Sequence, residues 1–196
     1  MTKNDATAVA RPNRHLPGEE GVWVFILGDM MIFSLFFCVY SYYRSLDPAL
    51  YLQSQALLNQ NFGAINTIFL LASSWFVVLA VHSVRGGEGH LAPRFIALAF
   101  LCGLAFAVVK VLEYSEKIGE GISLVTNEFF MYYFIFTGIH FLHVLIGLAV
   151  LAFLWRRARS GVHTKKERVF LESGASFWHM VDLLWIVLFP LLYLMR

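Results

Sequence analysis

The stretch SFWHMVDLLWIVLFPLLY, residues 176–193, decides the fold of this chain. It is apolar enough to cross a lipid bilayer, yet its first turns carry His179 and Asp182, which are three residues apart and so lie on one face of any helix. An ionisable side chain in hydrocarbon costs at least ~2.5 kcal/mol on insertion scales. We therefore expect a membrane-spanning helix whose polar pair faces protein or water.

The composition of the whole chain has the same character. Of its 196 residues, 59% are hydrophobic and only 14% are charged, whereas soluble domains usually have about 25% charged residues. Runs of about twenty apolar residues are long enough to cross a bilayer as helices. They cover residues 22–43, 62–84, 93–114, 128–155 and 175–195. The predicted fold class is therefore all-α, a polytopic bundle of five transmembrane helices forming one domain over residues 18–196, after a loose cytoplasmic tail at 1–17.

Lysine and arginine are distributed unequally between the two ends of these spans. The N-terminal tail and the second and fourth loops hold most of them: Lys3, Arg11, Arg14, Arg85, Arg94, Arg156, Arg157, Arg159, Lys165, Lys166 and Arg168. The opposite loops and the C-terminus hold Arg44, Lys117 and Arg196. The positive-inside rule therefore predicts a cytoplasmic N-terminus and an outside C-terminus. Basic loops beside a membrane usually contact anionic lipid headgroups, so no nucleic-acid partner is expected.

Distance along each predicted helix converts to depth in the membrane. Asp29 and Asp182 lie ~10 Å from the cytoplasmic ends of their helices and His179 lies ~6 Å from the same side. Ser73 and Ser74 come out near ~15 Å. These depths predict a polar layer in the cytoplasmic half that several helices share.

A second polar set lies toward the outer face, at the end of the third span. Lys110 and Glu113, and Glu113 and Lys117, have the spacings of helix ion pairs. The expected role is structural, with the long lysine stems reaching for the membrane interface.

His140 and His143 lie near mid-membrane on one face of the fourth span, which also carries Gly138 and Gly147. The first interpretation is hydrogen-bonded core residues in a helix that packs closely through its small residues. Haem ligation is the alternative, but a haem shared by His143 and His179 would need a vertical mismatch of ~12 Å. A metal site would need further ligands from other helices, and the carboxylates are expected at a different level. We predict no catalytic, cofactor-binding or metal-binding residue in the chain.

Four segments resemble subunit III of the haem-copper oxidases. ESGASFWHMVDLLWIVLF (172–189) resembles its C-terminal signature, with Trp178, His179, Asp182 and Trp185 in the pattern W-H-x-x-D-x-x-W. GIHFLHVLIG (138–147) and NTIFLLASS (66–74, beginning with Asn66) are similar to two other family segments. GDMMIFSLFF (28–37) resembles the helix that carries the family's intramembrane carboxylate, here Asp29.

The resemblance implies a five-span member, lacking the first two helices of seven-span versions. This form is similar to subunit III of quinol oxidases and to the accessory protein associated with nitric oxide reductase. Haem, with copper or non-haem iron, is then expected in partner subunits, and bound lipid is possible. The implied role is to stabilise the catalytic subunit in a bacterial inner membrane and to aid proton uptake from the cytoplasmic side.

Two other functions remain open on the residues alone. The chain could be a small b-type cytochrome that carries electrons through its own histidines. It could also be a transporter of protons or small solutes with Asp29 and Asp182 as carriers, although five unbroken spans do not resemble the two related halves of many transporters.

Overall fold

The structure, a computed structural model, describes residues 19–161 and 164–195. Its regular elements in this part are all helices, and five of them are long and apolar enough to cross a membrane. They are α1 (Glu20–Leu46), α2 (Pro48–Ala56), α3 (Gln60–Arg85), α4 (Ala92–Gly119), α5 (Glu128–Arg159), α6 (Lys165–Phe189) and a short π-helix, η1 (Pro190–Leu194). The predicted all-α bundle of five spans is confirmed. The predicted tail at 1–17 lies outside the described residues.

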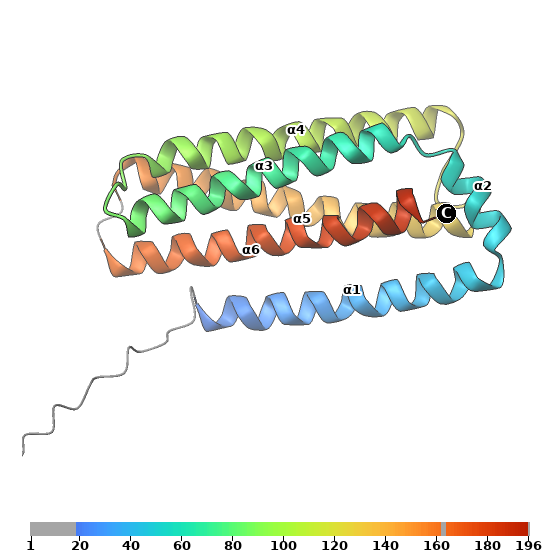
Figure 1. Cartoon of the computed structure of the whole chain (residues 1–196), viewed down its shortest axis with the longest axis horizontal. Helices are drawn as coiled ribbons and strands as arrows, with labels where there is room; N and C mark the ends of the chain where they lie inside the picture. Colours follow the sequence, from blue (N-terminus) through green and yellow to red (C-terminus); the bar gives the residue numbers. More distant parts are fainter. Residues whose placement is uncertain (1–18, 162–163, 196) are drawn as a thin grey trace, which may run out of the picture.

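The five long helices run side by side, and the short helix α2 lies at the end of the bundle near the C-terminus (Figure 1). Helix α6 is the most buried of the spans and α1 is the least buried. Because α6 packs against α1, α3 and α5, residues 176–193 run through the middle of the bundle.

Local signals set where several helices begin. At the start of α6, Thr164 and Glu167 form a capping box, in which the Thr164 hydroxyl accepts from the Glu167 N–H at 3.2 Å. The side chain of Asn127 accepts from the Phe130 N–H at the start of α5. The Thr164 cap starts α6 ten residues before the predicted span, whereas α5 begins at Glu128 as predicted and extends past residue 155 to Arg159.

The indole of Trp178 on α6 lies against two glycines of neighbouring helices. A Cβ atom added to Gly147 on α5 would lie 2.6 Å from this ring, and one added to Gly103 on α4 would lie 2.8 Å from it. Any side chain there would force the helices apart, so glycine is what allows α4, α5 and α6 to meet. Close packing at Gly147 is thereby confirmed. At Gly138 it is wrong, because the nearest neighbour of an added Cβ is the Tyr114 hydroxyl at 4.0 Å.

Candidate functional site: polar groups inside the bundle

A buried ion pair and two tyrosines form a polar cluster inside the bundle, which we name the Lys110 cluster: Lys110, Glu113, Tyr133 and Tyr193. The Lys110 ammonium donates to Glu113 Oε2 at 3.0 Å and to the hydroxyls of Tyr133 at 3.2 Å and Tyr193 at 3.0 Å. Both hydroxyls donate in turn to Glu113 Oε1, at 2.8 and 2.5 Å. All three N–H groups of the ammonium are therefore used, and α4, α5 and η1 are joined.

Aromatic rings surround the Lys110 ammonium. Its Nζ lies 4.9–5.6 Å from the ring centroids of four residues: Tyr114, Tyr133, Trp185 and Tyr193. This is the distance range of cation–π attraction. Such surroundings stabilise a cation that lipid would not solvate.

The structure confirms one predicted ion pair of this region and corrects two expectations. Lys110 does pair with Glu113, but its side chain is 1% exposed and does not reach the membrane interface. The Lys110 ammonium is solvated by hydrogen bonds inside the bundle and not by water at the membrane interface, where the sequence predicted it to lie. Glu113 does not pair with Lys117, whose ammonium contacts Glu120 at 2.7 Å and Glu116 at 3.6 Å instead.

A second polar link joins α1 to α5 through Asp29 and His143. Asp29 Oδ1 lies 3.3 Å from His143 Nε2, and His143 Nδ1 lies 2.9 Å from the carbonyl oxygen of Ile139. A carbonyl accepts only from an N–H, so Nδ1 carries a proton. In neutral His143 the other nitrogen, Nε2, is then an acceptor, and so is the Asp29 carboxylate. A hydrogen bond between them therefore needs a second proton, on either Nε2 or the carboxyl group. The two side chains therefore share one proton between them.

This contact overturns the predicted difference in level between Asp29 and the histidine pair. The predicted common level of Asp29 and Asp182 holds, because α1 and α6 run in the same direction, with Glu19 bonded to Ser173 and Phe25 packed on Phe177. The depth estimate assumed that all helices end in one plane. His143 lies 16 residues before the end of α5 at Arg159, whereas Asp29 lies 9 residues after the start of α1 at Glu20. At about 1.5 Å per residue, α5 therefore projects roughly 10 Å further than α1 at this end.

We expect Asp29 and His143 to be coupled in stability. Asp29→Leu and His143→Leu should each lower the melting temperature of the purified chain in detergent, and the double variant should lose less than the sum. Interaction energies of residues in contact are about 0.5–3 kcal/mol in such double-mutant cycles. Additive losses would mean that the two side chains do not interact.

His179 meets α3 through Ser74. The Ser74 hydroxyl lies 2.6 Å from His179 Nδ1. Asp182 Oδ1 is buried and makes no hydrogen bond within the described part of the chain. Within the described residues His179 and Asp182 form no ion pair with each other. The predicted link between helices is therefore present for His179, through a serine of α3, and not as a direct contact of His179 with Asp182.

The remaining motif residues are buried. Trp185 donates from Nε1 to the Thr67 hydroxyl at 3.0 Å, which ties α6 to α3. The His140 ring lies between Phe106 and Trp185, with ring centroids 5.8 and 5.3 Å away. His140 and Asn66 are both 0% exposed, and their side chains make no hydrogen bond within the described part of the chain.

Sequence reasoning missed the two tyrosines of the Lys110 cluster. Tyr133 lies 20 residues after Glu113 and Tyr193 lies 80 residues after it. The usable signal was weak: both tyrosines lie near the ends of their helices, at the level where the sequence placed Glu113. A tyrosine at that level is usually read as an interface residue.

These features define a helical membrane protein whose ionisable side chains bind one another across helices. The family model described as cytochrome c oxidase subunit III matches residues 16–196, and the chain belongs to this family. It is 30% identical to cytochrome c oxidase subunit 3 of Synechocystis sp., over 89% of this chain and 74% of that protein. It is also 30% identical to cytochrome bo(3) ubiquinol oxidase subunit 3 of Buchnera aphidicola, over 89% and 84%. Quinol oxidase subunit 3 of Bacillus spizizenii is 28% identical, over 89% and 85%.

Proposed function

We propose that this chain is a non-catalytic accessory subunit of a respiratory haem-copper oxidase, in which it stabilises the catalytic subunit. The observation that carries the proposal is the match to the subunit III family over residues 16–196, which contains all four motif segments. The structure adds that the motif residues are used for packing between helices. Haem and copper then belong to partner subunits.

The relatives differ in the electron donor that their names give. They include subunits of a cytochrome c oxidase and of a ubiquinol oxidase, so the comparison does not select one donor for this chain. The likeness of the five-span form to the accessory protein associated with nitric oxide reductase stays a prediction.

The orientation proposed for the chain places its basic end in the cytoplasm of a bacterium. The start of α1, the α3–α4 turn and the α5–α6 connection lie together at one end of the bundle (Figure 1). This end carries Arg85, Arg94, Arg156, Arg157, Arg159, Lys165, Lys166 and Arg168. The positive-inside rule supports a cytoplasmic position for it. Asp29 and His143 then lie in the cytoplasmic half, where a shared proton supports a role in proton uptake.

A groove at this basic end has the chemistry of a phospholipid site. It has a volume of about 750 Å³. Its apolar lining includes Phe153 and Phe170, and its charged lining has three cations against two carboxylates: Arg157, Lys165 and Lys166 against Glu19 and Glu167. Cations beside apolar side chains suit an anionic headgroup with its acyl chains. We propose that an anionic phospholipid binds here.

Removing charge from this groove should reduce bound lipid. We expect Arg157→Gln combined with Lys166→Gln to lower the phosphatidylglycerol retained by the purified chain several-fold in native mass spectrometry. Arg94→Gln, which removes a charge at the same end but away from the groove, is the matched control. Equal retention by the groove variant and the control would contradict the lipid site.

Co-purification tests the proposed function. A tagged chain extracted from membranes in mild detergent should bring down a haem-containing catalytic subunit, seen by its visible spectrum and by mass spectrometry. The chain purified alone should show no Soret band. A Soret band at one haem per isolated chain would instead establish the b-type cytochrome, and proton flux in liposomes containing only this chain would establish the transporter.

The geometry of the histidines favours the accessory subunit over the cytochrome. His143 uses both ring nitrogens, for Asp29 and for the Ile139 carbonyl. His140 is enclosed by Phe106 and Trp185. A haem iron would have to displace these partners.

A further inference from the structure

Most of the membrane-facing surface is aliphatic. On α4, the large exposed side chains between Leu98 and Leu112 are leucines and valines. On α1, Val24, Leu27 and Met31 are 66–77% exposed. Such side chains match acyl chains and need no other partner.

The exposed face of α3 differs because it carries a tryptophan in the middle of the span. Ile68, Leu71, Trp75 and Val78 recur at helical spacing, and Trp75 is 61% exposed. Trp75 lies ten residues before Arg85, the last residue of α3, which is ~15 Å or half the hydrocarbon thickness. Tryptophan is enriched at the membrane–water boundary rather than at this depth. Its indole N–H makes no hydrogen bond to any described residue, and acyl chains offer no acceptor.

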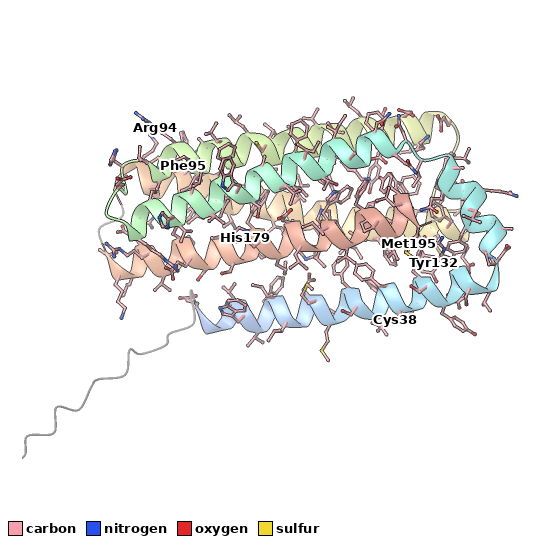
Figure 2. All side chains as sticks on the ribbon, viewed as in Figure 1. Cys38, Arg94, Phe95, Tyr132, His179 and Met195 are labelled. Carbon is pink, nitrogen blue, oxygen red and sulfur yellow. The ribbon has the colours of Figure 1, made fainter. Side chains whose placement is uncertain are left out.

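A second nitrogen without a partner lies beside it. His179 bonds through Nδ1 to Ser74, the residue next to Trp75, while its Nε2 has no hydrogen bond within residues 19–161 and 164–195. Figure 2 shows His179 along α6, which runs beside α3. Two ring nitrogens at one level of the same membrane-facing surface therefore lack a hydrogen-bond partner in the part of the chain that the structure describes.

A notch in the surface continues from this point toward the basic end. It has a volume of about 240 Å³, and Val78, Val81, Ser176 and His179 are among its lining residues. Small-molecule sites usually begin at about 300 Å³, so the notch fits a side chain better than a ligand. The ion pair of Arg85 and Glu172, at 2.8 Å, lies at its mouth.

We propose that the face made by Leu71, Trp75, Val78, His179 and Leu183 is the docking surface for a transmembrane helix of the catalytic subunit. That helix places a polar side chain at the level of Trp75 and His179, and a further side chain enters the notch. The hydrogen-bonding needs of the two nitrogens favour protein over lipid as the occupant, and aromatic residues such as Trp75 are typical interface anchors. The inference rests on the proposed function and names the surface through which it is performed.

Site-specific photocrosslinking in intact membranes tests this surface. A benzophenone amino acid at Leu71 or Val78 should give an adduct with the catalytic subunit, whereas the same group at Leu101 or Val111 on α4 should react with lipid. Lipid adducts alone from Leu71 and Val78 would overturn the proposal. Catalytic-subunit adducts from α4 instead would overturn the docking face but leave the proposed function intact. Loss of the catalytic subunit from both crosslinking and co-purification would remove the proposed function itself.

A substitution on the same face measures how strongly this surface holds the complex together. Trp75→Leu should raise the dissociation of the chain from the detergent-purified complex at least tenfold, since interface tryptophans are frequent hot spots. The melting temperature of the isolated chain should not change, because the Trp75 side chain projects outward. Leu101→Ala on α4 is the matched control and should leave dissociation unchanged. Equal dissociation of Trp75→Leu and wild type would refute the anchor role.

Discussion

Replacing Glu113 with glutamine is expected to destabilise the folded chain by about 3–5 kcal/mol, the range found when one partner of a buried ion pair is removed. Glu113 is 0% exposed and Lys110 is 1% exposed, so water cannot replace the lost carboxylate. The ammonium would keep its two hydroxyl acceptors and its ring contacts but lose the anion that neutralises it. For a chain of this size the melting temperature in detergent should fall by roughly 10 °C.

Two comparison variants separate this effect from a general effect of the substitution. Glu116→Gln changes the same residue type on the same helix, but the Glu116 side chain is 41% exposed, and its ion pair is worth little. Its melting temperature should therefore stay close to that of the wild type. The double variant Lys110→Met/Glu113→Leu removes both charges and should be more stable than Glu113→Gln alone. A wild-type melting temperature for Glu113→Gln would show that the Lys110 cluster contributes no stability.

The Lys110 cluster also explains how the end of the chain is held. The Tyr193 hydroxyl belongs to the cluster, and the Tyr193 carbonyl accepts from Gln60 Nε2 at 3.0 Å. Arg44, in the last turn of α1, donates to the carbonyl of Met195. Segments from α1, α3, α4 and α5 thus fasten η1. The cluster is a structural centre of the half of the bundle that contains η1, opposite the half that contains Asp29 and His143.

The spans could be predicted from the sequence because each is a long apolar run, and hydrophobic length alone determines a helix that crosses a bilayer. The Lys110–Glu113 pair could be predicted for a similar reason: its spacing lies within one helix, whose geometry is fixed. Both predictions depend only on local rules.

Contacts between helices could not be predicted in the same way. The Asp29–His143 contact depends on how far α5 projects past α1, and no local signal in either helix sets that offset. Similarly, the bond from Ser74 to His179 depends on the rotation of α3 relative to α6. The sequence named these polar residues as inward-facing, but it could not say which would meet.

The second large effect concerns Gly138 and Gly147 of α5. Substitution by alanine should stabilise the chain at Gly138 and destabilise it at Gly147. In the interior of a helix, alanine is more favourable than glycine by about 1 kcal/mol. Gly138→Ala should show part of this gain, because an added Cβ would meet nothing nearer than the Tyr114 hydroxyl at 4.0 Å. Gly147→Ala should instead lose about 1–3 kcal/mol, the usual effect of overpacking a core. Its Cβ would lie 2.6 Å from the Trp178 ring, which Gly103 confines from α4.

A second substitution shows whether the Trp178 ring causes that loss. Trp178→Leu should destabilise the chain by itself, yet in the Gly147→Ala background its additional loss should be clearly smaller, because the shorter side chain makes room for the new methyl group. Melting temperatures of the four proteins in detergent measure this coupling. If Gly147→Ala and Gly138→Ala instead gained equally, α5 and α6 would not be in close contact at Trp178. The neighbouring His179 would then not be held rigidly for its bond to Ser74. The proposed docking surface on α3 and α6 would lack a fixed position for His179.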